Sequence, residues 1–266
     1  MDLSFLWQGI LSVTWKQFVM YVVGGLLIYL AIEKEYEPAL LMPMGFGAIL
    51  VNLPLSGVIN QFTAGLGETP GIIQWLFETG IGVSEALPIL LFIGIGAMID
   101  FGPLLSNPKL FLCGAAAQTG IFMTIILAVA MGFDLKDAAS IGIIGAADGP
   151  TSILVSQVLR SKYVGAIAVA AYSYMALVPI IQPVAIKLVT TKKDRAMRMG
   201  YKVRNVSRRT RILFPIFVTV IAGLVAPSSV ALVGFLMFGN LIRECGVLTT
   251  LSLCAQNELA NLITLL

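Results

Sequence analysis

One carboxylate lies in the middle of an apolar stretch of this chain, beside residues that break helices. Residues 138–159 read AASIGIIGAADGPTSILVSQVL, and Asp148 is their only charged side chain. Pro150 disfavours helix at Gly149 and removes a backbone donor, whereas Gly149 accepts unusual torsions. We therefore expect a helix break here, with backbone groups that water, an ion or another segment must satisfy.

The residues around Asp148 predict a site for a hard cation. A carboxylate in the middle of a membrane costs about 2.5–3.5 kcal/mol on insertion scales, so a functional reason is expected. Thr151 and Ser152 add neutral oxygens, and carboxylate, hydroxyl and carbonyl oxygens together suit Na⁺, with H⁺ as its competitor. The structural alternative is a cap on a second half-helix at 151–159. A serine would cap at a lower insertion cost, so we favour the ion site.

A second break is predicted at Asp100-Phe101-Gly102-Pro103, after the apolar run 86–99. Fourteen residues are too few to cross a bilayer comfortably, so this element is expected to be broken or re-entrant. Asp100 is either an ion ligand or a residue of a turn or cap, and the turn is the default interpretation.

The apolar segment 163–186 carries further candidates in its interior. Tyr172 and Tyr174 are two residues apart, which on a helix separates them by about 200°, so at most one can face the site. Gln182 lies between Pro179 and Pro183, a pattern that predicts a kinked, hydrated region.

The composition predicts an all-α polytopic membrane protein. Of the 266 residues, 58% are hydrophobic and 12% are charged, about half the charge of a soluble domain, and the mean hydropathy is +0.93. The apolar blocks lack the polar faces of soluble helices. Segment 18–32 is expected to be a retained span because no signal-peptide pattern surrounds it. The blocks without charge are 38–67, 110–133, 163–186 and 212–242, with a shorter one at 17–32.

Two residue counts exclude other chemistry. The chain has no histidine, which rules out Ser-His-Asp and Cys-His catalysis and histidine metal sites, so Na⁺ is the only metal expected. Cys113, Cys245 and Cys254 have no paired spacing and are expected to be small core residues.

A basic segment fixes the predicted orientation. Ten of the 17 Lys and Arg residues fall within 187–211, opposed only by Asp194, which predicts a cytoplasmic loop. Arg160 and Lys162, at the expected outer end, run mildly against this orientation. The loop is either an anchor on anionic lipid or a docking surface for an acidic partner.

An internal repeat is predicted from a shift of 192 residues. Ala39-Leu40 then falls on Ala231-Leu232, and Phe46-Gly47 on Phe238-Gly239. This pattern favours an inverted-repeat transporter with broken or re-entrant helices. We expect a first repeat at 1–186, with broken helices near 100 and 148, the basic loop at 187–211, and the start of a second, truncated repeat at 212–266.

Small residues inside the apolar runs predict close helix contacts. Gly94 and Gly96 lie in one run, and Gly142 and Gly145 in another. Small side chains let membrane helices approach closely, so these glycines are expected to be structural.

The chain resembles a known family over residues 88–266. The residues that carry this resemblance are GIGAMIDFGPLLSNPKLFLCGAAAQTGIF, IGIIGAADGPTSI, GAIAVAAYSYMALVPIIQP, FGNLIRECGV and AQNELANLITLL. They resemble the beta subunit of the sodium-translocating biotin-dependent decarboxylases, which act on oxaloacetate, methylmalonyl-CoA or glutaconyl-CoA.

The resemblance implies a carboxybiotin decarboxylase subunit whose reaction consumes an outer proton and drives Na⁺ export. It implies that Asp148 is the essential membrane aspartate and Tyr174 the functional tyrosine. It also implies a biotin-carrying carboxyltransferase alpha subunit, a small single-span gamma or delta subunit, a homo-oligomer, no nucleic acid, and a bacterial or archaeal cytoplasmic membrane. Because the family uses further residues of the second repeat, the chain alone is expected to be inactive.

Two other functions remain open at this point. A secondary Na⁺/H⁺ antiporter would use Asp148 to exchange the two ions. A scaffold subunit without transport activity would not need Asp148. The organic substrate is decarboxylated on a partner and leaves no signature in this sequence.

Overall fold

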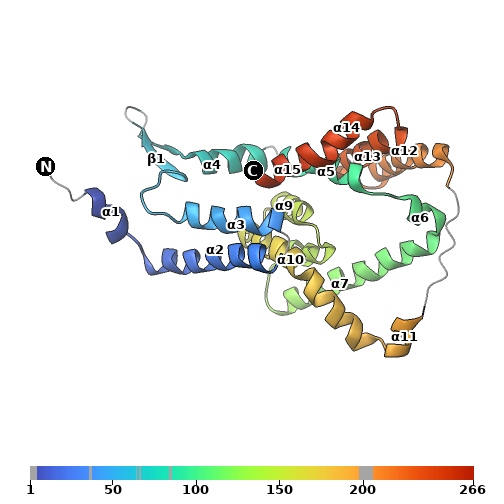
Figure 1. Cartoon of the computed structure of the whole chain (residues 1–266), viewed down its shortest axis with the longest axis horizontal. Coiled ribbons are helices and arrows are strands. Elements are labelled where there is room, and N and C mark those ends of the chain that lie inside the picture. Colours follow the sequence, from blue (N-terminus) through green and yellow to red (C-terminus); the bar gives the residue numbers. More distant parts are fainter. Residues whose placement is uncertain (1–4, 36–37, 64, 66, 84–85, 198–205) are drawn as a thin grey trace. The chain divides into compact units, whose positions relative to one another are not determined.

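The computed structural model is almost entirely helical (Figure 1). It describes residues 5–35, 38–63, 65, 67–83, 86–197 and 206–266. In chain order the elements are α1 Phe5–Leu11, α2 Trp15–Glu33, α3 Pro38–Val51, β1 Asn60–Thr63, β2 Gly67–Pro70, α4 Ile72–Phe77, the π-helix η1 Glu78–Val83, α5 Ala86–Met98, α6 Gly102–Ser106, the 3₁₀-helix η2 Pro108–Leu110, α7 Phe111–Ala130, α8 Leu135–Gly142, the 3₁₀-helix η3 Ile143–Ala146, α9 Gly149–Val158, α10 Val164–Val189, α11 Lys192–Ala196, α12 Arg208–Val225, the 3₁₀-helix η4 Pro227–Ser229, α13 Val230–Cys245, α14 Thr249–Cys254, the π-helix η5 Ala255–Leu259 and α15 Ala260–Leu265.

Among the described residues, three helices are long and apolar enough to cross a membrane: Trp15–Glu33, Pro108–Ala130 and Pro227–Cys245. The number rises to five if two bent helix pairs, which include α5 and α10, each count as one span. Trp15–Glu33 covers the predicted segment 17–32, and Pro108–Ala130 covers the predicted segment 110–133 except for its last three residues. These helices confirm the prediction of a polytopic helical membrane protein.

The uncharged block 38–67 is not one span, as its length had suggested. Its helix α3 ends at Val51, after 14 residues, and the antiparallel hairpin β1–β2 follows, with Asn60 opposite Pro70. Asn52, Pro54 and Gly57 end the helix because they favour turns, and Gly57 takes a positive φ of 69°. The absence of charge in block 38–67 does not distinguish one long span from a shorter helix followed by a β-hairpin.

The chain divides into two compact units, residues 1–86 with 264–266 and residues 87–263. In the first unit, α2 and α3 form a helical hairpin. A Cβ on Gly24 would lie 2.6 Å from the Gly45 carbonyl oxygen, and one on Gly45 would lie 2.7 Å from that of Gly24. The Tyr21 hydroxyl also donates to the Asn52 carbonyl at 2.9 Å. The predicted repeat boundaries concern sequence similarity and stay a prediction.

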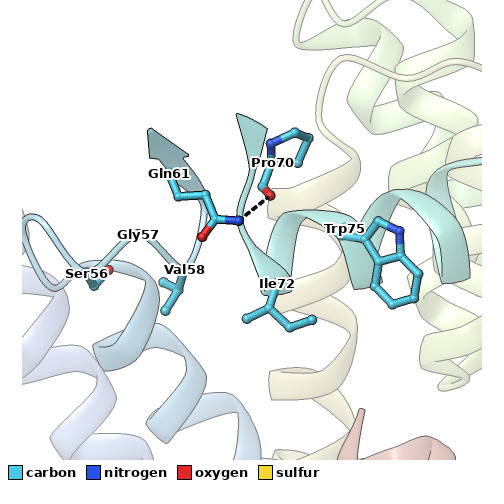
Figure 2. Close-up of a pocket in the computed structure, with 7 residues that line it drawn as sticks. All are labelled: Ser56, Gly57, Val58, Gln61, Pro70, Ile72 and Trp75. Atoms are coloured by element: carbon cyan, nitrogen blue, oxygen red, sulfur yellow. Dashed lines mark hydrogen bonds between the residues drawn. The ribbon is translucent and has the colours of Figure 1, made fainter. Parts of the chain in front are cut away.

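The first unit also contains an open pocket of about 460 Å³ beside the β-hairpin (Figure 2). Across the hairpin, the Gln61 side-chain amide donates to the Pro70 carbonyl at 3.5 Å. None of the seven lining residues is titratable, and none is a predicted site residue. The lining is Ser56, Gly57, Val58, Gln61, Pro70, Ile72 and Trp75.

In the second unit, α5 makes backbone contacts through its glycines, as the sequence predicted. A Cβ on Gly96 would collide with the Leu236 carbonyl of α13, and one on Gly239 of α13 would collide with the Ile93 carbonyl of α5. On Gly94, a Cβ would lie 2.7 Å from the Ala255 carbonyl. Close approach of the helix backbones therefore requires glycine at these positions.

Candidate functional site

The predicted helix break is present and lies at Ala147 and Asp148. The helical path α8–η3 ends when Ala147 takes a left-handed conformation with φ 54°, and Asp148 is then extended with φ −135° and ψ 104°. A new helix, α9, begins at Gly149, with Pro150 in its first turn, where the missing N–H costs nothing.

The three predicted sodium-site residues come together at this break. The Thr151 hydroxyl donates to Asp148 Oδ2 at 2.5 Å, and the Ser152 hydroxyl donates to the Asp148 backbone carbonyl at 2.8 Å. Asp148 is the N-cap residue of α9, and the Thr151 hydroxyl that binds its carboxylate belongs to the first turn of that helix. This position is compatible with a cap as well as with an ion site, so the choice between the two stays a prediction.

Of the two tyrosines, Tyr172 lies at the break. A Cβ on Gly149 would lie 2.6 Å from Tyr172 Cε1, so the phenol ring rests directly on the Gly149 backbone. Three residues later on the same face of α10, Met175 Sδ accepts from the Gly149 N–H at 3.2 Å. Tyr174 lies on another face and is 36% exposed. This confirms that the tyrosines diverge, while the role of Tyr174 stays a prediction.

Gln182 does not join this group. It is exposed in the second half of α10, whose halves Val164–Met175 and Ile180–Val189 are bent by 68°. The predicted bend in this helix is present, but it lies at residues 176–179, before Gln182. Pro179 lacks the N–H that would continue the helix there.

The segment 138–159 folds back on itself as a helical hairpin. Ser161, beyond the end of α9, donates its hydroxyl to Asp137 Oδ1 of α8 at 2.7 Å, across 24 residues. The Lys162 N–H donates to the same oxygen at 3.1 Å. Asp137 is 7% exposed, so α8 and α9 are joined at their far ends by a buried carboxylate. Sequence reasoning missed Asp137, which follows the cap residue Asp134 and looks like part of an interfacial turn.

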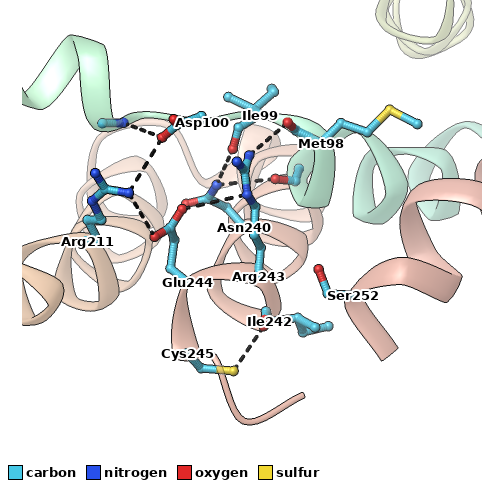
Figure 3. A network of polar contacts seen from close by, with 12 residues as sticks. Met98, Ile99, Asp100, Arg211, Asn240, Ile242, Arg243, Glu244, Cys245 and Ser252 are labelled. Carbon is cyan, nitrogen blue, oxygen red and sulfur yellow. Dashed lines mark hydrogen bonds and ion pairs between the residues drawn. The ribbon is translucent and has the colours of Figure 1, made fainter. Parts of the chain in front are cut away.

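Asp100 lies in a separate polar cluster (Figure 3). One of its oxygens accepts from the Gly102 N–H at 2.8 Å and lies 3.9 Å from Arg211 of α12. Arg211 in turn lies 3.7 Å from Glu244 of α13. The structure thus places Asp100 in a turn, in line with its default interpretation, with the positively charged Arg211 side chain nearby.

Asn240 of α13 completes this cluster. It is 1% exposed, and its amide donates to the carbonyls of Gly96 at 3.2 Å and Ile99 at 2.8 Å. Arg243, one turn further, donates to the Met98 carbonyl at 2.8 Å. These bonds satisfy carbonyls that α5 leaves open at its C-terminus. Asn240 and Arg243 thereby hold the break at Asp100 against α13.

Comparison with known proteins gives a consistent result. A family profile described as "Na+-transporting oxaloacetate decarboxylase beta subunit" matches residues 16–266. The methylmalonyl-CoA decarboxylase subunit beta of Propionigenium modestum is 46% identical, over 97% of this chain and 69% of its own length. The glutaconyl-CoA decarboxylase subunit beta of Acidaminococcus fermentans is 47% identical, over 97% and 66%. The probable oxaloacetate decarboxylase beta chain of Vibrio cholerae is 42% identical, over 97% and 71%.

The chain spans about two thirds of the length of these relatives. The match includes the helix break, the α8–α9 hairpin and the cluster around Asp100. The chain belongs to the family of beta subunits of sodium-transporting decarboxylases, the membrane subunits of decarboxylase sodium pumps.

Proposed function

We propose that this chain is the membrane subunit of a decarboxylase sodium pump, in which the decarboxylation of carboxybiotin drives Na⁺ export and takes up a proton. The observation that carries this proposal is the Asp148 carboxylate at a helix break, with the Thr151 hydroxyl 2.5 Å away. It is supported by the similarity to beta subunits of methylmalonyl-CoA, glutaconyl-CoA and oxaloacetate decarboxylases.

Asp148 has the properties of a site that exchanges one cation for another. Its carboxylate, its own carbonyl and the hydroxyls of Thr151 and Ser152 gather oxygen ligands that fit Na⁺. A proton on the carboxylate would remove the charge that attracts Na⁺, so the two cations compete for one group. Carboxybiotin supplies the driving reaction, the loss of CO₂ from a ureido nitrogen, which takes up one proton. Competition at Asp148 would couple that proton to Na⁺.

The partners follow from the same proposal. Biotin would be carried by an alpha subunit, beside a single-span gamma or delta subunit and further copies of the beta subunit. The basic segment 187–211 would face the cytoplasm of a bacterial or archaeal cell, where the carrier must dock. In its short helix α11, hydrogen bonds from the Thr191 hydroxyl and backbone lower the pKa of Asp194. These bonds form the capping box at the start of α11.

Two equivalent runs of elements support an inverted repeat. The helical hairpin α2–α3 is followed, after the β1–β2 hairpin, by the six-residue helix α4, the π-helix η1 and α5. The helical hairpin α12–α13 is followed by the six-residue helix α14, the π-helix η5 and α15. π-Helices are rare, so their recurrence at corresponding places favours two copies of one unit.

Transport assays separate the pump from the antiporter. The complex containing this chain, in inverted vesicles, is expected to accumulate ²²Na⁺ only when the carboxylated carrier is supplied. If a pH gradient alone drives ²²Na⁺ uptake, the pump hypothesis is rejected in favour of the antiporter. Vesicles with a carrier that lacks biotin are the control for carrier binding without chemistry.

The two tyrosines give a second test. Tyr172→Phe keeps the ring against Gly149 and removes only the hydroxyl, whereas Tyr174→Phe changes a partly exposed side chain. If the functional tyrosine is the one that contacts the helix break, Tyr172→Phe lowers carboxybiotin-driven ²²Na⁺ uptake and raises the Na⁺ concentration that gives the half-maximal rate. Tyr174→Phe then leaves that concentration unchanged. The opposite result would favour the assignment by family resemblance.

A further inference from the structure

The peptide unit that joins Asp148 to Gly149 is held by two side chains of another helix. The Gly149 N–H donates to Met175 Sδ of α10 at 3.2 Å, across 26 residues of the chain. A Cβ on Gly149 would lie 2.6 Å from Cε1 and 2.7 Å from Cζ of Tyr172, so the Tyr172 ring packs on the same peptide unit. We call these two side chains of α10 the Gly149 clamp.

The clamp sets the direction of the Asp148 carbonyl. A peptide unit is planar and trans, so its C=O points away from its N–H. Because Met175 fixes the Gly149 N–H, it also fixes the Asp148 carbonyl of the same unit. That carbonyl accepts from the Ser152 hydroxyl at 2.8 Å and from the Ser152 N–H at 3.1 Å, and it is one of the proposed Na⁺ ligands.

The start of α9 needs an acceptor from outside the helix. The first N–H groups of a helix have no partner within it, and Pro150, the second residue of α9, has no N–H at all. The Gly149 N–H is therefore the first donor of this helix, next to the proposed ion ligands. Met175 binds it from α10 and thereby ties the helix break to that helix.

A thioether is well suited to this position. Its sulfur is a weak, soft acceptor, whereas Na⁺ prefers hard oxygen ligands. Met175 can thus bind the Gly149 N–H without adding an oxygen that would compete with Asp148 for the cation. No charge is added to the apolar surroundings either.

The clamp also lies directly before the bend of α10. Met175 is the last residue of the first half, Val164–Met175, and the second half, Ile180–Val189, is bent by 68° relative to it. The basic segment 187–211 begins in the second half. A change in this bend would act first on Met175, so the clamp lies where the second half of α10 can influence the Asp148 site.

We propose that Met175 is a positioning residue of the Asp148 site. Its bond to the Gly149 N–H holds the Asp148 carbonyl in the direction that Na⁺ binding requires, and loss of the bond lowers the affinity for Na⁺. The identity of the ion rests on the proposed function, whereas the contacts of the clamp do not depend on it.

Met175→Leu and Met175→Gln separate the acceptor from the packing. Leucine keeps much of the apolar volume but has no acceptor, whereas glutamine has a similar length and an amide oxygen. Equilibrium binding of ²²Na⁺ to the purified complex, in scintillation proximity format, measures affinity without transport. We expect Met175→Leu to raise the half-saturating Na⁺ concentration severalfold and Met175→Gln to bring it back toward the unmodified value.

Met44→Leu is the matched control. Met44 is half-buried in α3, as Met175 is in α10, and its sulfur takes part in no hydrogen bond within the described part of the chain. Its half-saturating Na⁺ concentration is expected to stay unchanged. The inference is overturned if Met175→Leu binds Na⁺ as the unmodified complex does. It is also overturned if the leucine and glutamine variants are equally impaired, since packing alone would then explain the loss.

Hydrogen–deuterium exchange at the Gly149 N–H tests the clamp directly. Mass spectrometry with residue resolution on the complex in nanodiscs should show exchange several-fold faster in Met175→Leu than in the unmodified complex, and slow again in Met175→Gln. Unchanged exchange and Na⁺ binding in Met175→Leu, in a complex that carboxybiotin drives, would reject the positioning role alone. Faster exchange and weaker Na⁺ binding, in a complex that carboxybiotin cannot drive, would reject the pump and keep the positioning role.

Discussion

Asp148→Asn is expected to reduce carboxybiotin-driven ²²Na⁺ uptake to the level of vesicles without the protein. The substitution removes the only charge in segment 138–159 and the only group there that can exchange Na⁺ for H⁺. It keeps the volume of the side chain and an oxygen that can accept from the Thr151 hydroxyl. The loss would therefore come from the charge and not from a collapsed hairpin. Uptake and CO₂ release are measured on the same vesicles.

Asp134→Asn is the control for this variant. Asp134 belongs to the same hairpin but is exposed, and its side chain accepts from the Lys136 N–H at 3.4 Å as the cap of α8. Asparagine is an equally good cap, so near-normal uptake is expected. If Asp148→Asn transports Na⁺ at the unmodified rate, the chain is a scaffold subunit and the sodium site lies elsewhere.

Gly239→Ala is expected to have the largest effect on stability. Its new methyl group would meet the Ile93 carbonyl, and the backbone of α5 cannot move aside as a flexible side chain could. Overpacking of this kind costs about 1–3 kcal/mol. Separation of α5 from α13 would also break the bonds that Asn240 makes to Gly96 and Ile99. A lower unfolding temperature in detergent, with less complex recovered, is the expected measurement.

Gly120→Ala shows whether helix propensity could explain that result. Gly120 lies within α7, and a Cβ there would meet nothing within 4 Å. Alanine favours a helix by about 1 kcal/mol over glycine, so this variant should be as stable as the unmodified chain or more so. Equal losses in Gly239→Ala and Gly120→Ala would contradict the direct contact between α5 and α13.

The sequence predicts the helix break of the candidate site because the residues that cause it are neighbours in the chain. A proline after a glycine must disturb a helix, and a carboxylate in an apolar segment must have a partner, wherever the segment lies in the fold. For this reason the break at Asp148 and the divergence of Tyr172 and Tyr174 agree with the structure. The glycine contacts of α5 follow from equally local patterns.

The features that the sequence did not reveal depend on contacts between distant segments. In the sequence, Asp137 looks like an exposed acid, because its partner Ser161 lies 24 residues further along the chain. Asn240 looks like an isolated polar residue in an apolar helix, because the Ile99 carbonyl that it binds lies at the end of the distant helix α5. The block 38–67 was misread for another reason, since hydropathy does not separate a helix from a hairpin of apolar and neutral residues. Pairings across more than twenty residues cannot be read from spacing alone.

The closed base of the α8–α9 hairpin has a consequence for how the protein enters the membrane. Because Asp137 and Ser161 meet, the hairpin starts and finishes on one side and adds no crossing. With respect to membrane topology, α10 therefore follows α7 directly, as if the hairpin were a loop between them. Insertion of this hairpin into lipid on its own would be unfavourable in free energy, because its tip carries a charge. We therefore expect it to insert only after α7 and α10 surround a protein-lined cavity. The proposed sodium site would then form late, during assembly of the helices and not during their translocation.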